Sequence, residues 1–523
     1  MRVLFVTNGF PPSEIGGTEV LARNVGRRFL ENRDEVIVFA PAYSHEQEND
    51  SLVEGMRIHR VPVPGRKVRE VVSFSYVDGA VDLKFASFLL EAKPEVTIVW
   101  HTVNLSARIL EVLDRIGVPY ILFLNDFHFL CNQINLLTVA MQPCDGPEDG
   151  TKCKDCIALT IREVIDRDGV HPAQLGRLRV STMKRLLGFA NTIVAASDFV
   201  KEKYVDFGLD AGRISVISPG VDVKSIRSNF KPLASDRLRF GFFGGNSVPK
   251  GILDVLEAFR SIEDPSIELI LAGQGLNEIS PENLPPNTRI IGRYFPEDVG
   301  QVLSEIDVLV IPSRCHESYS ILAREAAACG VPIIVSDLRA QSDALQDGVN
   351  GLCFKAGEPA DLAAKVLLLR NDAKLLQSFK NRASTVRSIE QTATELWNLC
   401  KDLVRTERVT GTEMERQFSS FLNEGIDRME EERRAIETHL EQTLEALDKL
   451  NQTRTELLTI QDSFGYRVMK CYASRIDRLL PDGTRRGEFR RVVTTSLHII
   501  MEQGIRSYLR LAWKKIGRRS SEA

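Results

Sequence analysis

Short apolar runs recur along the first 385 residues, and segments of helix length separate them. In the first part of the chain, the runs lie at residues 3–6, 36–39, 96–100, 120–124, 193–195 and 215–217. The rhythm restarts in a second part, with runs at residues 238–243, 268–271, 289–291, 308–311 and 333–335. Because these runs are rich in β-branched residues and mostly apolar on both faces, they are typical of parallel strands buried inside a covered sheet.

This alternation predicts two doubly wound α/β domains, at residues 1–225 and 236–385. A polar segment without a sustained period, SPGVDVKSIRSNFKPLASD, lies between them, and we interpret it as the interdomain linker. Ligands of open parallel sheets bind beyond the carboxyl ends of the strands. With two such sheets in one chain, we expect the functional site in a cleft that both domains face.

The hydrophobic period changes from about Thr412 onward. Apolar residues alternate four and three positions apart from residue 422 to residue 457, and Arg433 and Arg454 occupy a positions of the heptads. This pattern predicts a coiled coil at residues 412–462, through which the chain forms a homo-oligomer. A long helix lying on the protein's own body is the alternative, which the two arginines in the seam keep open.

The composition is that of an ordinary globular protein. The 523 residues suffice for two or three domains, with 43% hydrophobic and 26% charged residues. The net charge of −4 by itself favours neither nucleic acid nor a membrane as a partner. The charge is uneven, however, because residues 464–519 contain 14 lysines and arginines against 4 aspartates and glutamates.

This basic tail, residues 463–523, also has an amphipathic pattern. Leu509, Trp513 and Ile516 fall on one helical face amid arginines and lysines. The pattern predicts an interfacial helix on an anionic membrane surface, which would bring an enzyme to a lipid-linked acceptor. Packing on a partner protein is an alternative. RNA binding is less favoured, since no nucleic-acid motif accompanies the charge, and we expect no nucleic-acid partner.

The pattern of apolar residues also predicts where the protein is located, and the location in turn predicts the state of its cysteines. The first residues, MRVLFVTNGFPP, lack the apolar stretch of a signal peptide, and no window approaches the ~20 apolar residues of a membrane span. We therefore expect a cytoplasmic protein, at most peripheral on the inner face of the plasma membrane, with reduced cysteines. A chelating C-x2-C pair falls in a loop-rich stretch, where structural zinc and four free thiols both fit. The four residues are Cys131, Cys144, Cys153 and Cys156.

A glycine pair follows the first strand of each predicted domain. Gly16-Gly17 opens an amphipathic helix in the first domain, where a tight turn and a ligand-binding loop are equally good interpretations. Gly244-Gly245 ends the corresponding strand of the second domain, and Lys250 stands at the start of the next helix. A lysine beside free backbone N–H groups suits a diphosphate, although a solvated loop lysine also fits.

The stretch RCHESYSILAREAAACG carries two glutamates eight positions apart. Glu317 precedes a predicted helix, and Glu325 lies inside it among apolar neighbours, where a carboxylate needs a partner. The helix start between them offers free N–H groups and the positive end of the dipole. The layout fits a nucleotide-sugar, with the sugar on Glu317, the diphosphate at the helix start and the ribose on Glu325; two unrelated glutamates are the alternative. The residues assigned to this binding segment are Ser318, Tyr319, Ile321 and Leu322.

Seven segments together resemble the family 4 retaining glycosyltransferases of the GT-B fold. They are GGTEVLARNVGRRF, ASDFVKEKYVDFG, ISVISPGVD, PKGILDVLEAF, LILAGQG, ESYSILAREAAACGVPIIVSD and DGVNGLCF, in the family's order over roughly residues 1–385. The resemblance implies an acceptor-side and a donor-binding Rossmann-like domain, with a helix at 386–405 that crosses back to the first. It also implies sugar transfer from a UDP-, GDP- or similar donor with retention, and no cofactor requirement for catalysis.

The resemblance assigns roles to residues. Glu317 and Glu325 match the family's glutamate pair, Lys250 its phosphate-binding lysine, and Gly17 the loop between the donor phosphates and the acceptor. An arginine that the family usually has shortly before the lysine is missing here. Lys250 therefore acts alone, or a nearby arginine replaces the missing one; the candidates are Arg293 and Arg324.

Two further departures concern the acceptor side and the donor sugar. Asn125 stands where the family's active-site histidine is expected, in NDFHFLC, and an asparagine can bond a sugar hydroxyl but cannot act as a base. Asp126 follows it, and His128 either compensates or is a structural histidine. DLRAQSDAL replaces a glycine pair and a glutamate that are usual near the donor, which leaves the donor sugar open.

The sequence as a whole predicts a glycosyltransferase that acts on a bacterial surface polysaccharide or glycolipid. Its catalytic residues would be Glu317, Lys250, Asp126 and Asn125. A catalytically inactive scaffold that assembles a polysaccharide-synthesis complex through the coiled coil is the main alternative. Another GT-B enzyme, such as an epimerase or a phosphorylase, fits less well, because a soluble sugar gives the tail no use and no lysine context for pyridoxal is evident.

Overall fold

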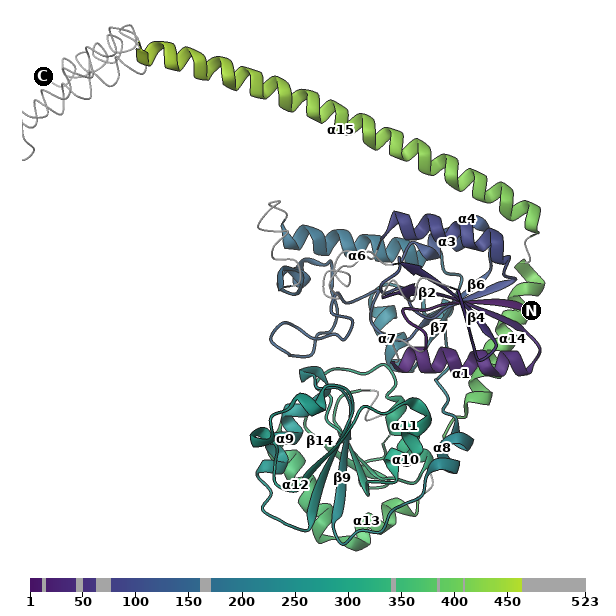
Figure 1. Ribbon diagram of the computed structural model, residues 1–523, viewed down its shortest axis with the longest axis vertical. Helices are drawn as coiled ribbons and strands as arrows, with labels where there is room; N and C mark the ends of the chain where they lie inside the picture. Colours follow the sequence, from purple (N-terminus) through teal and green to yellow (C-terminus); the bar gives the residue numbers. More distant parts are fainter. Residues whose placement is uncertain are drawn as a thin grey trace, which may run out of the picture. The chain divides into compact units, whose positions relative to one another are not determined.

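The computed structural model describes residues 1–11, 16–43, 50–62, 77–159, 171–339, 345–382, 386–407 and 410–462. The chain forms two compact units, Met1–Phe421 and Leu422–Ala523. The first unit contains two sheets, each covered by helices (Figure 1). The fold is thus the predicted pair of Rossmann-like α/β domains. The predicted basic tail at 463–523 lies outside the described residues.

The first sheet has eight strands in the order β3-β4-β2-β1-β5-β6-β7-β8, parallel throughout except for β3. The strands are β1 (Arg2–Val6), β2 (Glu35–Ala42), β3 (Ser51–Val53), β4 (Met56–Pro62), β5 (Val96–Val99), β6 (Tyr120–Leu124), β7 (Thr192–Ala195) and β8 (Ile214–Val216). The helices of this domain are α1 (Gly17–Glu31), α3 (Gly79–Ala92), α4 (Ile109–Ile116), α6 (Pro172–Gly188) and α7 (Asp198–Asp206).

Strand β1 shows how this sheet is buried on both faces. Successive side chains of a strand point to opposite sides. Val3 and Phe5 join the core formed with α1 and α14 (Ile389–Glu407), whereas Leu4 and Val6 join the core formed with α3 and α4. Each such buried side chain contributes roughly 1.5–3 kcal/mol relative to exposure, which explains why the sequence is apolar on both faces here.

The second sheet has six parallel strands in the order β11-β10-β9-β12-β13-β14. The strands are β9 (Leu238–Phe243), β10 (Ile267–Ala272), β11 (Thr288–Gly292), β12 (Val308–Ile311), β13 (Ile333–Ser336) and β14 (Gly351–Phe354). One core packs it against α9 (Ile252–Arg260), α12 (Pro359–Asn371) and α13 (Ala373–Lys380). The other packs it against α8 (Val223–Asn229), α10 (Val299–Leu303) and α11 (Ile321–Ala328).

The predicted strands β6, β9 and β12 have the bounds that the sequence indicated, and the other predicted strands differ at their ends. The prediction that residues 218–236 form an irregular linker is wrong in part, because α8 lies within it. Asp222 caps this helix by accepting the Ser225 N–H at 3.0 Å, and Ile226 is its one buried residue. A two-turn helix with one buried residue produces no hydrophobic period.

Helix α14 (Ile389–Glu407) packs on the first sheet, although it follows the second domain in the chain. The Trp397 indole N–H donates to Asp34 at 2.7 Å, and the Thr392 hydroxyl donates to the Ser218 carbonyl at 2.8 Å. Ile389 is completely buried in the same core as α1. The helix therefore ties the end of the second domain to the first.

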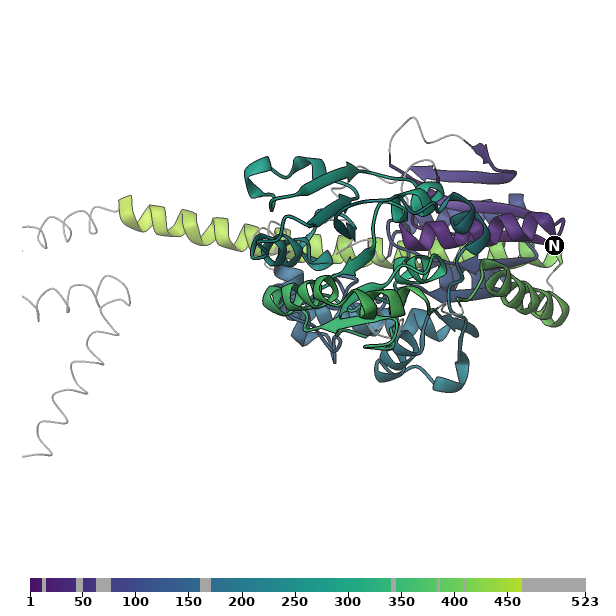
Figure 2. The same ribbon diagram turned by 90° about the horizontal axis from the view of Figure 1, so that it is seen from below.

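Helix α15 (Gly411–Asp462) contains 52 residues and continues without interruption (Figure 1), and its last turns are seen again from below in Figure 2. Its first turns belong to the first unit, where Met414 and Phe421 are buried in the core with α3 and α4. Further along, the predicted seam residues Leu447 and Leu450 are 53% and 69% exposed. Among the described residues, none of the helices is both long enough and apolar enough to cross a membrane.

Candidate functional site

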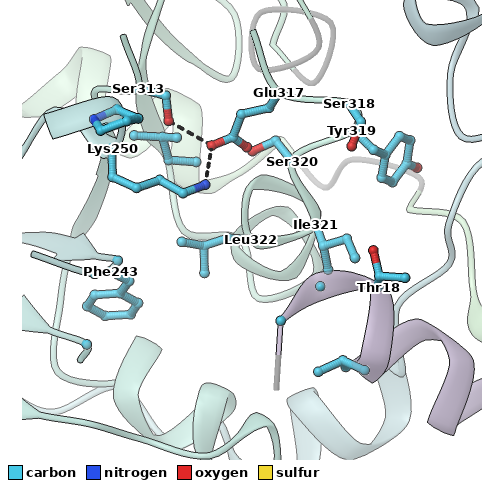
Figure 3. Close-up of a pocket in the computed structure, with 18 of the residues that line it drawn as sticks. Thr18, Phe243, Lys250, Ser313, Glu317, Ser318, Tyr319, Ser320, Ile321 and Leu322 are labelled. Atoms are coloured by element: carbon cyan, nitrogen blue, oxygen red, sulfur yellow. Dashed lines mark hydrogen bonds and ion pairs between the residues drawn. The ribbon is translucent and has the colours of Figure 1, made fainter. Parts of the chain in front are cut away.

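A cavity of about 840 Å³ lies between the two sheets, and residues that follow strands of both sheets line it (Figure 3). It sits where parallel α/β folds place their ligands, beyond the carboxyl ends of strands. The structure brings together here all of the residues predicted to act in catalysis or substrate binding. They are Gly16, Gly17, Asn125, Asp126, Gly244, Gly245, Lys250, Glu317, Ser318, Tyr319, Ile321, Leu322 and Glu325.

Lys250 and Glu317 form an ion pair in the cavity. The Lys250 Nζ lies 2.9 Å from Glu317 Oε1, and the Ser313 hydroxyl donates to the same oxygen at 2.7 Å (Figure 3). Although burial opposes ionisation, Lys250 and the neighbouring hydroxyls hold the pKa of Glu317 below its usual range, and Glu317 raises the pKa of Lys250. Both groups are therefore charged at neutral pH, and the ammonium has further N–H donors for an anion.

Glycine at position 251 sets the place of Lys250. Lys250 ends a single turn of 3-10 helix, and Gly251 follows with φ 76°. A Cβ atom at Gly251 would lie 1.9 Å from the Pro312 carbonyl oxygen. Only glycine combines the left-handed conformation with this close approach, so the backbone passes tightly under β12 and leaves the Lys250 side chain at the cavity.

Helix α11 begins at the cavity after an unusual residue. Ser320 has φ 59° and ψ 71°, the left-handed region, which costs a non-glycine residue roughly 1–2 kcal/mol. The turn directs the chain from Glu317 into the helix, whose first N–H groups have no partner within the helix. The helix start therefore presents backbone donors beside Lys250, an arrangement that favours an anion.

Glu325 lies one turn further along α11 and also lines the cavity. In the described part of the chain, its carboxylate has no hydrogen bond or ion pair, and burial raises its pKa to about 7. A half-buried carboxylate without a cation is costly unless a ligand supplies donors. The Glu325 carboxylate is thus available for the ribose hydroxyls that the sequence assigned to it.

The wall opposite these residues comes from the first domain. The Asn125 side-chain N–H donates to the Trp100 carbonyl at 3.0 Å, which fixes the amide and leaves its oxygen as the group available to a ligand. Asp126 accepts the His128 backbone N–H at 2.8 Å and contacts His101 Nε2 at 2.6 Å. Despite burial, these contacts hold the pKa of Asp126 below its usual range.

His101 is a residue of this site that the sequence interpretation missed. It is buried and does not line the cavity, yet it orients Asp126. Its Nδ1 accepts the Val103 backbone N–H at 3.0 Å, so the ring proton is assigned to Nε2, which donates to Asp126. Its position two residues after the end of β5 was the available signal, because β5 and β6 are neighbours and their carboxyl ends share one edge.

We expect His101→Ala to lower kcat/KM for sugar transfer about tenfold, the effect of losing one hydrogen bond to a charged group. His101→Gln should recover part of the activity, because its amide can donate to Asp126. The rate at which each purified variant releases nucleoside diphosphate measures its activity. Full activity of His101→Ala would show that Asp126 needs no such support.

The other residues considered for this site are placed differently. Arg293 lines the cavity, whereas Arg324 does not, because its guanidinium donates to the backbone oxygens of Tyr319 and Ser320. Of the two candidate arginines, only Arg293 is thus available as a second cation in the cavity. His128 is buried, does not line the cavity, and has its pKa held low by burial. We interpret His128 as structural.

The structure does not support the predicted zinc site at Cys131, Cys144, Cys153 and Cys156. Among the described residues, no three potential ligand side chains are arranged to hold a metal ion. These four cysteines form no disulfide in the described part of the chain, and burial raises the pKa of Cys131 to about 11 and that of Cys153 to about 12. Cys144 directs its thiol to the Gly146 carbonyl at 3.6 Å.

Two family models match adjoining parts of the chain. Glycosyltransferase Family 4 matches residues 15–225, and Glycosyl transferases group 1 matches residues 226–386. Among curated relatives, the D-inositol 3-phosphate glycosyltransferase of Geodermatophilus obscurus is 28% identical over 245 residues, 42% of this chain and 54% of that protein. The phosphatidyl-myo-inositol mannosyltransferase of Mycobacterium leprae is 31% identical over 191 residues, 34% and 50% of the two chains. The chain spans about half the length of the curated relatives it matches.

Solved structures share the fold at low sequence identity. The sucrose-phosphate synthase of Thermosynechococcus elongatus has a TM-score of 0.59 at 17% identity, over 77% of this chain and 98% of that one. Anabaena Alr3699/HepE, in complex with UDP and glucose, has a TM-score of 0.54 at 14% identity, over 77% and 100%. The two family models and the two Rossmann-like sheets thus lead to the same conclusion. The chain belongs to the GT-B glycosyltransferases, with a family 4 domain followed by a group 1 domain.

Proposed function

We propose that this protein transfers a sugar from a nucleoside-diphosphate donor, with retention at the anomeric carbon, to a glycan or lipid-linked acceptor. The observation that carries the proposal is the layout along α11. A charged lysine–glutamate pair lies at one end, free N–H groups lie at the helix start, and a carboxylate without a partner lies one turn further. These three features suit a sugar, a diphosphate and a ribose. Anabaena HepE, which shares the fold, binds UDP and glucose.

The residues divide the reaction between them. Glu317 would accept hydrogen bonds from the donor sugar, while Lys250 and the start of α11 would stabilise the charge that grows on the departing diphosphate. The bond from the anomeric carbon to the diphosphate oxygen breaks, and a bond to the acceptor oxygen forms on the same face. Because the pKa of Asp126 is held low and Asn125 is no base, the acceptor proton would go to the departing diphosphate.

A thermal-shift screen of nucleoside diphosphates and nucleotide-sugars tests this proposal most directly. We expect one nucleotide class to raise the melting temperature, because a ligand that binds only the folded state stabilises it. Transfer or hydrolysis of the corresponding sugar donor should follow. A protein that responds to no nucleotide would contradict the proposal.

A catalytically inactive scaffold is the second candidate, and Asn125 is the observation that favours it. Its side-chain amide is bound to the Trp100 backbone, so it offers the cavity an acceptor and no base. A protein that binds nucleotide and neither transfers nor hydrolyses any sugar donor would support the scaffold. Turnover of a donor would exclude it.

We propose in addition that α15 self-associates through its heptad seam. Support comes from the unbroken helix and from Leu447 and Leu450, which are 53% and 69% exposed. We expect an oligomer in sedimentation equilibrium and a monomer for the Leu447→Glu/Leu450→Glu double variant, because charges in the seam oppose association. Lys449→Glu, outside the seam, is the control and should remain oligomeric. A monomeric wild type would contradict the proposal.

The basic tail at 463–523 lies outside the described residues, so its attachment to an anionic membrane surface remains a prediction from composition. Cosedimentation of the full chain with anionic and with neutral vesicles tests it. Binding to the anionic vesicles alone is the expected result. Equal recovery with both would remove the electrostatic argument.

A further inference from the structure

The backbone of Ser320 is held in a conformation that glycine adopts without strain. Its φ of 59° lies in the left-handed region, and the residue stands between Glu317 and the first turn of α11. A serine there adds strain and contributes a hydroxyl. Strained conformations of this kind cluster at functional sites, where the surrounding structure maintains them. We therefore ask what the Ser320 hydroxyl contacts.

That hydroxyl lies in the catalytic centre. Ser320 is 7% exposed and lines the cavity. The Glu317 Oε1 atom already binds the Lys250 ammonium and the Ser313 hydroxyl. In Figure 3 the Ser320 hydroxyl points to the other carboxylate oxygen of Glu317. The two serines thus flank the carboxylate, one on each side.

The arrangement matters most when an anion occupies the cavity. Lys250 is then shared between Glu317 and the anion, so Glu317 loses part of its interaction with the ammonium. A carboxylate in this buried position needs other donors to stay ionised and oriented. Ser313 already donates to Glu317, and the Ser320 hydroxyl lies where it can donate to the second oxygen. Neither hydroxyl leaves when Lys250 turns to a phosphate.

We propose that Ser320 is a positioning residue, whose hydroxyl holds the second carboxylate oxygen of Glu317 so that Glu317 faces the donor sugar while Lys250 engages the diphosphate. The inference rests on the proposed function and adds to it Ser320, a residue within the binding segment to which the sequence assigned no role. The left-handed backbone is part of the role, since it places the hydroxyl beside Glu317 before the helix begins.

Two substitutions separate the hydroxyl from the backbone strain. Ser320→Gly removes both, so we expect its melting temperature to rise by about 2 °C while kcat/KM falls about tenfold. Ser320→Ala removes the hydroxyl and keeps the strained conformation, so it should lose the same activity without the gain in melting temperature. Arg33→Gly is the control: Arg33 is exposed, has φ 63° in the turn after α1, and lies away from the cavity. It should gain stability and keep wild-type kinetics.

The pH dependence of kcat/KM adds a measurement that a purely structural role of Ser320 would leave unchanged. The Ser320 hydroxyl is one of the groups that lower the pKa of Glu317. Its removal raises that pKa, so the acidic limb of the kcat/KM profile should shift to higher pH in both Ser320 variants and stay in place for Arg33→Gly. Wild-type activity and profile in Ser320→Gly would overturn the inference alone. A wild-type protein that neither binds a nucleotide nor turns over a donor would overturn the proposed function with it.

Discussion

Replacing Lys250 with alanine is expected to lower kcat for sugar transfer by about 10²–10³. Lys250 Nζ lies 2.9 Å from Glu317 Oε1 and at the cavity, beside the start of α11. A fixed cation aimed at charge that develops in the transition state contributes about this much to catalysis. Binding of the free nucleoside diphosphate should weaken far less, because the N–H groups of α11 and Glu325 remain. Single-turnover rates and nucleotide affinity, measured on the same preparation, separate the two effects.

Lys355→Ala is a matched control for this change. Lys355 belongs to the same domain, is exposed, and also pairs with a glutamate, Glu358, at 3.3 Å. It should leave both turnover and binding unchanged. If Lys250→Ala retained full turnover, or lost affinity as strongly as turnover, the assigned role in stabilising the leaving diphosphate would be wrong.

The sequence predicted those parts of the fold whose signal is local. Continuous apolar runs such as Tyr120–Leu124 mark strands buried on both faces, and two series of them predicted both sheets. Strand β4 has instead an alternating pattern, MRIHRVP, because only part of its surface is buried, and it was missed. Strand β14, GLCF, contains no β-branched residue, and helix α8 is too short to show a period. Such elements form because the neighbouring structure supplies their partners.

The same distinction holds for the site. A carboxylate among apolar residues is visible in the sequence, so Glu325 and its need for a partner were predictable. The relation of His101 to Asp126 depends on the pairing of β5 with β6, which brings together residues 25 positions apart. The left-handed backbone of Ser320 is imposed by the surrounding structure, and nothing in the local sequence indicates it. Distant pairing and backbone conformation therefore supplied what the pattern of residue types did not.

Glu325→Ala is expected to weaken nucleoside-diphosphate binding by about 10–100-fold, the effect of losing hydrogen bonds to a charged group. The same change should raise the melting temperature of the ligand-free protein at pH 8. Burial raises the pKa of Glu325 to about 7, above the value of an unfolded chain, so the folded state holds its proton more tightly. The contribution of this group to stability is then lost as the pH rises toward 7 and beyond. A variant that is more stable but binds the nucleotide more weakly would show that Glu325 serves ligand binding at a cost in stability.

Two further measurements test the role of Glu325. They are the pH dependence of nucleotide affinity and the effect on affinity of removing a ribose hydroxyl. Ribose hydroxyls donate to the ionised carboxylate, so the affinity of the wild type should rise between pH 6 and pH 8. Glu325→Gln should lose the part of this dependence that the phosphates of the nucleotide do not account for. A 2′-deoxynucleoside diphosphate should bind the wild type more weakly than the ribonucleotide does, whereas Glu325→Ala should bind both alike, as in a double-mutant cycle. If the variant still preferred the ribonucleotide by the wild-type factor, the ribose would lie elsewhere, and the open carboxylate on α11 would need another partner.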